Sequence, residues 1–186
     1  MRRAIFLDRD GVINYAVVRN GKPFPPATLE DFVYIPGVED SIKKLRDAGF
    51  LVIIVTNQPD VATGVQSREV VESMHQKLIV DKLCDDIRVC YHTDKDRCSC
   101  RKPKPGMLIE AAALWGIDLN NSILVGDRWR DIQAGKAVNC FTYFIDYKYQ
   151  EKNSIVPDLT VPSLAFATKD ILRNYNSKDF KNERAI

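Results

Sequence analysis

Short apolar runs and amphipathic segments alternate along this chain. Four apolar runs, each closed by a polar or charged residue, have the length and composition of buried parallel strands. They lie at residues 4–7, 51–55, 122–125 and 141–145. Between them, apolar residues recur at helical spacing in segments 37–48, 67–83, 105–115 and 131–137. The alternation predicts an α/β fold with a three-layer, doubly wound parallel sheet and helices on both faces.

Three segments have neither the apolar runs of buried strands nor apolar residues at helical spacing. Residues 20–26 are rich in glycine and proline and predict a loop, and residues 91–105 are too polar and cysteine-rich for a regular element. From about residue 174 the chain is polar without an apolar face. We therefore expect one catalytic domain at 1–174, a polar tail at 175–186, and no room for a large cap domain.

The charge balance changes this picture little. A net charge of +2 from 27 basic and 25 acidic residues gives no overall field that would attract nucleic acid or an anionic membrane. The apolar run at 4–7 is too short for a signal-peptide core, and no other run has the length to cross a bilayer. We expect a cytosolic monomer without nucleic-acid or membrane partners.

Candidate chemistry gathers at the carboxyl ends of the predicted strands, where ligands bind in open parallel sheets. The residues there are Asp8, Asp10, Thr56, Asn57, Asp127 and Asp131, joined by Lys102 and Lys104 from the irregular segment. Such a set can hold Mg²⁺, present a nucleophile and bind a phosphoryl group. A single strand-end aspartate is commonly a helix cap, and this alternative stays open for Asp131. Lys104 has the alternative of a solvated side chain.

A cysteine-rich segment at about 90–100 predicts a structural zinc site. Cys90, His92, Cys98 and Cys100 supply three sulfurs and one imidazole, which complete a tetrahedral Zn²⁺ shell. The alternative is a group of ordinary buried cysteines, but the polar residues 93–97 offer no apolar core to join. The remaining cysteines and histidine are expected to bind no metal. Cys84 and Cys140 are expected to be packing residues, and His75 is expected to lie on a helix surface.

Four sequence motifs, in order, resemble those of the haloacid dehalogenase (HAD) superfamily. They are FLDRDGVIN at 6–14, VTN at 55–57, KPKPGM at 102–107 and VGDRWRDIQAG at 125–135. The resemblance implies a phosphatase in which Asp8 is the nucleophile and Asp10 the general acid and base. It also implies Mg²⁺ held by Asp8, the Asp10 carbonyl and Asp127, with Asp131 as a possible water-mediated partner. Thr56, Asn57 and Lys102 would hold the phosphoryl oxygens.

Within that superfamily, the C-x-H and C-x-C-R-K-P spacing is similar to that of the heptose bisphosphate 7-phosphatases and of the histidinol phosphatases. Asn14 and the TNQ at 56–58 favour the heptose branch. The resemblance implies that Arg101 contacts the substrate and that Lys102 contacts its phosphoryl group. By the same comparison Arg19, Gln58 and Arg128 are candidate substrate contacts. The segment 16–19 departs from the usual polar run, and Arg128 stands where lysine is common.

The resemblance implies a small phosphorylated sugar as substrate, most specifically the 7-phosphate of D-glycero-D-manno-heptose 1,7-bisphosphate. Histidinol phosphate or another small phosphomonoester is the enzymatic alternative. A nucleic-acid-end-processing or binding module is disfavoured by the balanced charge. A catalytically inactive binding protein is disfavoured by the complete set of Asp8, Asp10, Thr56, Lys102 and Asp127.

Overall fold

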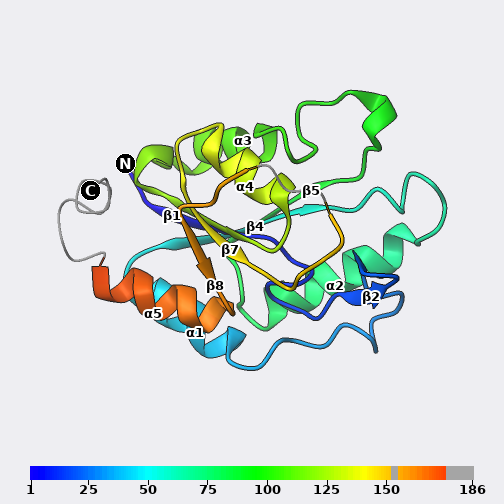
Figure 1. Ribbon diagram of the computed structural model, residues 1–186, viewed down its shortest axis with the longest axis horizontal. Helices are drawn as coiled ribbons and strands as arrows, with labels where there is room; N and C mark the ends of the chain where they lie inside the picture. Colours follow the sequence, from blue (N-terminus) through cyan, green and yellow to red (C-terminus); the bar gives the residue numbers. More distant parts are fainter. Residues whose placement is uncertain (152–154, 175–186) are drawn as a thin grey trace.

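The computed structural model describes residues 1–151 and 155–174. Six parallel strands form one sheet in the order β5-β4-β1-β6-β7-β8 (Figure 1). Their bounds are β1 Ala4–Leu7, β4 Leu51–Asn57, β5 Asp86–Cys90, β6 Ile123–Gly126, β7 Phe141–Ile145 and β8 Leu159–Val161. The sheet therefore has β1 at its centre, with β4 and β6 paired to its two sides.

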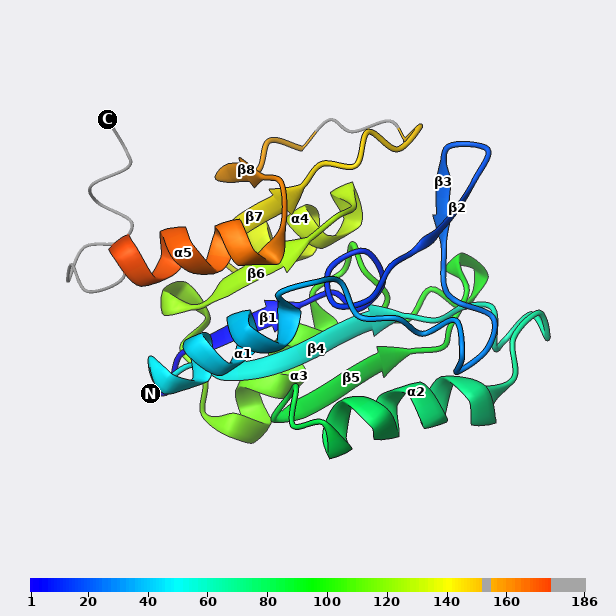
Figure 2. The ribbon, with the colours of Figure 1, turned by 90° about the horizontal axis from the view of Figure 1, so that it is seen from below.

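Helices cover both faces of the sheet, so the predicted three-layer architecture is confirmed. The helices α1 (Val38–Asp47), α2 (Arg68–Val80) and α5 (Leu164–Asn174) pack on one face around Ile5, Leu7 and Val52. On the other face, α3 (Gly106–Trp115) and α4 (Trp129–Lys136) pack around Phe6 and Ile53 (Figure 2). Alternate residues of each central strand thus enter opposite cores, which explains why these runs are apolar throughout.

The two edge strands of the sheet and one helix lie where the sequence pattern predicted no element. The strand β5 was missed because its sequence DIRVC is half polar, and β8 has only three residues. Helix α5 was not predicted, although Leu164, Ala167 and Ile171 recur at helical spacing and pack into the core. The predicted tail at 175–186 lies outside the described residues.

An antiparallel hairpin replaces part of the loop predicted at 20–26. Strands β2 (Val17–Arg19) and β3 (Lys22–Phe24) are joined through Asn20 and Gly21, both with positive φ. An Asn-Gly pair is a strong signal for such a two-residue turn. The hairpin stands beyond the carboxyl ends of β1 and β4 (Figure 2).

Among the described residues, no helix combines the length and apolar character needed to cross a bilayer.

Candidate active site

The carboxyl ends of the three central strands meet beneath a pocket of about 230 Å³. Asp8 follows β1, Thr56 and Asn57 end β4, and Asp127 follows β6. The backbone amide of Asp8 donates to the Val125 carbonyl at 3.0 Å, which extends the pairing of β1 with β6 to Asp8. The pattern of polar residues after apolar strands therefore predicted where the site lies.

Gly11 allows the chain to turn tightly between the carboxylates. Its φ is +86°, a left-handed conformation that L side chains rarely adopt, and a Cβ there would lie 1.9 Å from Asp127 Oδ2. A side chain at position 11 would displace the Asp127 carboxylate.

The Lys102 ammonium is buried among acceptors at the centre of the site. Its Nζ donates to Asp8 Oδ1 at 2.9 Å, to Asp131 Oδ1 at 2.6 Å and to the Val55 carbonyl at 2.7 Å. Burial alone would lower the pKa of Lys102, but the Asp131 and Asp8 carboxylates raise it above its ordinary value. Lys102 is therefore a fixed cation next to the Asp8 carboxylate.

Asn57 holds the backbone of Lys102 in place. Its Nδ2 donates to the Lys102 carbonyl at 2.9 Å, and its Oδ1 accepts from the Lys102 amide at 3.1 Å. Both polar ends of the Asn57 side chain are thus engaged, which gives it a positioning role. Asn57 also lines the pocket and has a second N–H on Nδ2, so its contact with the phosphoryl group stays a prediction.

Three carboxylates converge beside Lys102 and form a site that could hold a cation. Oxygens of Asp8, Asp127 and Asp131 all lie within 4.8 Å of one another. Burial, followed by repulsion from Asp131, raises the pKa of Asp8 to about 6 despite Lys102. Burial and the charges of Asp8 and Asp131 raise the pKa of Asp127 well above its usual range. Both Asp127 oxygens are buried without a hydrogen-bond partner of good geometry. A divalent cation would satisfy this cluster, since hard cations bind carboxylate oxygens.

Asp131 has two roles in this arrangement. Its Oδ2 accepts from the Arg128 amide at 3.0 Å, which caps α4, while its Oδ1 accepts from Lys102. The capping alternative raised by the sequence is therefore correct. It coexists with a place for Asp131 in the carboxylate cluster.

Asp10 is held by three neighbouring donors. The Arg9 guanidinium donates through Nε and Nη2 at 3.0–3.2 Å, and the amides of Asn14 and Gln58 donate at 2.9 and 2.8 Å. Burial works against ionisation, but the charge and hydrogen bonds of Arg9, with those of Asn14 and Gln58, leave the pKa of Asp10 below its ordinary value. Asp10 is therefore ionised at neutral pH in this arrangement.

Thr56 has a hydroxyl proton available for the pocket. Its Oγ1 accepts from Gln58 Nε2 at 2.9 Å and donates to no other group in the described part of the chain, so its proton can be donated to a ligand. Gln58 itself is 1% exposed and does not line the pocket. The predicted substrate contact through Gln58 does not fit this placement, because its amide is occupied in orienting Asp10 and Thr56.

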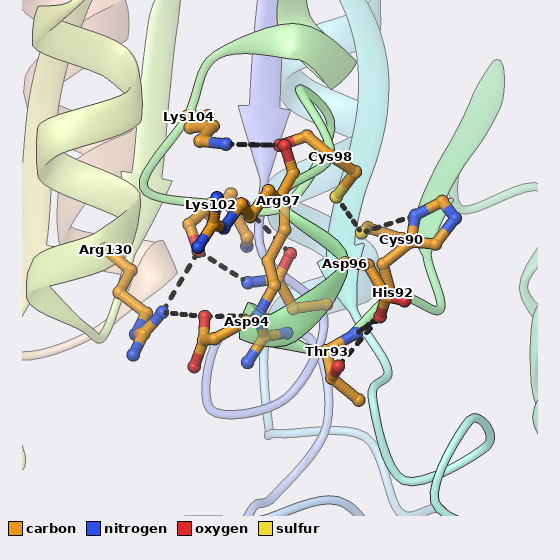
Figure 3. A network of polar contacts seen from close by, with 12 residues as sticks. Cys90, His92, Thr93, Asp94, Asp96, Arg97, Cys98, Lys102, Lys104 and Arg130 are labelled. Atoms are coloured by element: carbon orange, nitrogen blue, oxygen red, sulfur yellow. Dashed lines mark hydrogen bonds and ion pairs between the residues drawn. The ribbon is translucent and has the colours of Figure 1, made fainter.

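The four predicted zinc ligands come together in one cluster, partly drawn in Figure 3. The Cys90 sulfur lies 3.1 Å from that of Cys100 and 3.7 Å from that of Cys98, and His92 Nδ1 lies 3.3 Å from Cys100. A tetrahedral zinc with Zn–S bonds of about 2.3 Å separates its sulfurs by about 3.8 Å, so the cluster has nearly the size that Zn²⁺ needs. The expectation that this segment has no apolar core to join is wrong for Cys90, which is buried with Phe6 and Val55.

Three cations bind side-chain or backbone oxygens of the cysteine-rich loop. Arg101 Nε and Arg130 Nη1 donate to Asp94 Oδ1 at 2.8 and 3.2 Å, and Lys104 Nζ donates to the carbonyls of Arg97 and Cys98 (Figure 3). Lys104 therefore stabilises the loop instead of being a freely solvated side chain.

Of the three arginines predicted to contact the substrate, one lines the pocket and two do not. Arg128 lines the pocket and pairs with Glu151. Arg101 and Arg19 are absent from the pocket lining; Arg101 is bonded to Asp94, and Arg19 lies over the Phe24 ring. Arg130 and Lys22 line the pocket instead, and the sequence analysis missed both.

Two further residues differ from expectation or were missed. His75 is buried, with Nε2 lying 3.2 Å from Arg9 Nη1, so its predicted place on a helix surface is wrong. Arg9 is fully buried beside Asp10 and was not singled out, although it lies inside the first motif. Cys140 is buried, and Cys84 packs against the core, as predicted for residues outside the metal set.

A family model described as haloacid dehalogenase-like hydrolase matches residues 27–139. The chain belongs to this family. Among curated relatives of this HAD hydrolase, the D-glycero-β-D-manno-heptose-1,7-bisphosphate 7-phosphatase of Rhodopseudomonas palustris is 39% identical over 149 residues, covering 73% of this chain and 79% of the relative. The enzyme of the same name from Pseudomonas aeruginosa is 38% identical over 144 residues, covering 75% and 78%. A relative from Photorhabdus laumondii, named for the α anomer, is 39% identical over 147 residues, covering 72% and 76%.

Solved structures agree with this assignment. The HAD hydrolase is similar to the D,D-heptose 1,7-bisphosphate phosphatase of B. bronchiseptica, solved with magnesium and phosphate. The TM-score is 0.75 at 26% identity, covering 92% of this chain and 98% of that one. HAD phosphatases use Mg²⁺, which agrees with the carboxylate cluster at Asp8, Asp127 and Asp131.

Proposed function

We propose that this HAD hydrolase is a phosphomonoesterase that acts through an aspartyl-phosphate on Asp8 and removes the 7-phosphate of D-glycero-D-manno-heptose 1,7-bisphosphate. The observation that carries the proposal is the pocket lined by Asp8, Thr56 and Lys102, in which the buried Asp8 carboxylate accepts from the Lys102 ammonium. The names of the curated relatives support the sugar, and they include both anomers.

In the first step an Asp8 oxygen attacks phosphorus while the bond from phosphorus to the sugar oxygen breaks. The bonding electron pair stays on the leaving oxygen, which takes up a proton. A carboxylate needs no activating base for this attack, because it is already ionised at neutral pH. Thr56 and Lys102 donate toward the phosphoryl oxygens as negative charge develops there.

In the second step a water oxygen attacks phosphorus, and the bond to Asp8 breaks to release inorganic phosphate. Asp10 is the proton carrier in both steps: it protonates the leaving sugar oxygen and then accepts the proton of the attacking water. Arg9, Asn14 and Gln58 keep Asp10 ionised without substrate. A phosphate dianion next to Asp10 favours its protonated form, because like charges repel.

The carboxylates of Asp8 and Asp127, with the Asp10 carbonyl, would hold Mg²⁺, and Asp131 would bind through water or directly. When bound, the ion offsets repulsion between the anionic nucleophile and the anionic phosphate. Cys90, His92, Cys98 and Cys100 would hold a structural Zn²⁺ that fixes the loop before Lys102.

Replacing the nucleophile tests the proposal directly. Asp8→Asn keeps the size of the side chain and removes its nucleophilic charge, so we expect kcat to fall by at least about 10³-fold with the fold intact. Asp47→Asn on α1 removes a surface carboxylate and should leave kcat unchanged. Assays should include both heptose bisphosphate anomers and histidinol phosphate. Turnover by Asp8→Asn above background would refute the role of Asp8, and a preference for histidinol phosphate would refute the sugar assignment.

A further inference from the structure

One cation that lines the active-site pocket has no ion-pair partner among the described residues. Four cationic side chains line the pocket: Lys22, Lys102, Arg128 and Arg130. Three of them are paired, Lys102 with Asp8 and Asp131, Arg128 with Glu151, and Arg130 with Asp94. Within the described part of the chain, Lys22 has neither an ion pair nor a side-chain hydrogen bond. Its ammonium is therefore available to a ligand.

The hairpin that carries Lys22 is anchored instead of projecting freely. The Gln150 amide donates to the Gly21 carbonyl at 2.8 Å, and a Cβ on Gly21 would lie 2.7 Å from the Gln150 side chain. Glu151, the next residue, pairs with Arg128. Residue 150 thus holds the turn before Lys22, and residue 151 holds the guanidinium of Arg128. Lys22 and Arg128 are both cations that line the same pocket.

The hairpin also brings positive charge together. Arg19 lies directly opposite Lys22 in the register of β2 and β3, and residues 17–24 contain no carboxylate. Like charges facing one another across two strands are destabilising. An anion bound at this end of the pocket would relieve that repulsion.

The two ends of the pocket therefore differ in chemistry. Asp8, Thr56 and Lys102 form the reacting end at the carboxyl edge of the sheet, and Lys22 to Pro25 form the hairpin end. A substrate with a single phosphate at the reacting end would leave Lys22 without a partner. A substrate with a second anionic group would bind both ends.

We propose that Lys22 binds the second anionic group of a bisphosphorylated sugar and so selects bisphosphates over monophosphates. This inference rests on the proposed phosphatase function and deepens it. The contact is to the phosphate that is not transferred, so it fixes the orientation in which the other phosphate reaches Asp8. Lys22 is then a specificity-determining residue without a role in the bond-breaking steps.

The test compares two substrates in two variants. Heptose 1,7-bisphosphate and heptose 7-phosphate differ only in the second anionic group. For Lys22→Met we expect kcat/KM to fall about 10-fold or more with the bisphosphate and less than about 2-fold with the monophosphate. Lys22→Arg should restore most of the preference, because it keeps the cation. Lys43→Met, which removes an exposed lysine on α1, should change neither value.

Lys22 is exposed, so Lys22→Met is expected to fold normally, and an unchanged melting temperature will verify this. An equal loss with both substrates, or no loss with either, would overturn the role of Lys22 while leaving the phosphatase assignment standing. Failure of the wild-type protein to hydrolyse either substrate would overturn the proposed function, and the Lys22 inference with it.

Discussion

At the scale of single residues, Arg9 connects Asp10, the proposed general acid and base, to the core. Its side chain is fully buried; Nε and Nη2 bind the Asp10 carboxylate, and Nη1 lies 3.2 Å from His75 Nε2. Because arginine can only donate, His75 must accept through Nε2 and carry its proton on Nδ1. Burial, together with Arg9, lowers the pKa of His75 to about 4, so the ring stays neutral at physiological pH. Arg9 thereby fixes the direction of Asp10.

Removing this guanidinium should affect both stability and activity. In Arg9→Met, the largely buried Asp10 carboxylate would lose its cationic partner, so we expect the free energy of unfolding to fall by about 3 kcal/mol. We also expect kcat to fall more than KM rises, because Asp10 handles protons in the transition state. Urea denaturation and steady-state kinetics measure the two effects. A loss below about 1 kcal/mol with normal kcat would contradict the role given to Arg9.

At the scale of elements, the cysteine-rich loop determines where Lys102 lies. The loop runs from Cys90 at the end of β5 to α3, and Gly106 is packed so closely that a Cβ would lie 2.4 Å from the Ser99 carbonyl. Arg130 on α4 donates to Asp94 of the loop. A metal that joins Cys90 to Cys98 and Cys100 would hold both sides of the loop together.

We expect one tightly held zinc ion per chain, measurable by elemental analysis. Cys98→Ser should lower the zinc content and increase proteolytic cleavage between residues 93 and 104, because the metal would join the two sides of the loop. It should also lower kcat by displacing Lys102. Cys84→Ser, outside the cluster, is the matched control. Undiminished protection from proteolysis in zinc-free protein would contradict a structural zinc.

Element patterns also explain what the sequence could and could not predict. Four strands, β1, β4, β6 and β7, were predictable because buried parallel strands are apolar throughout. Asp8 and Asp127 were predictable as site residues because they stand at the carboxyl ends of two of these strands. The roles of Arg9, Lys22 and His75 were not predictable, because they depend on contacts between separate elements. The hairpin was predictable from Asn20-Gly21, but its placement over the pocket depends on Gln150.

At the scale of the whole molecule, the site concentrates negative charge where the three central strands end. Asp8, Asp127 and Asp131 are all buried, and Lys102 is the cation bonded to two of them. Without a divalent ion, burial and mutual repulsion raise the pKa values of Asp8 and Asp127 and so disfavour their ionisation. Binding of Mg²⁺ to the folded state alone would therefore stabilise the fold as well as prepare the site.

The stabilisation by Mg²⁺ should depend on pH. The pKa of Asp8 is about 6 in the folded chain, above its ordinary value of 3.8, so the metal-free folded state gains stability as pH falls through that interval and loses it as pH rises. Protons and Mg²⁺ compete for the same carboxylates. We expect the increase in melting temperature produced by Mg²⁺ to be largest above about pH 7 and to shrink below pH 6.

Thermal melts with and without MgCl₂ between pH 5 and 8 measure this effect. Asp127→Asn should abolish most of the Mg²⁺-dependent increase and raise the melting temperature of the metal-free protein, because it removes a buried charge. If Mg²⁺ raised the melting temperature by the same amount at every pH in this range, and did so also in Asp127→Asn, the ion would bind at a site other than the carboxylate cluster.

The covalent intermediate on Asp8 is the central claim, and trapping it is the most direct test. The protein is mixed with substrate labelled in the transferred phosphate, quenched in acid within milliseconds and digested for peptide mapping. The mechanism predicts label on the peptide that contains residue 8, lost in Asp8→Asn and released by water as inorganic phosphate. Rapid turnover without a labelled peptide, or label bound to a residue other than Asp8, would contradict it.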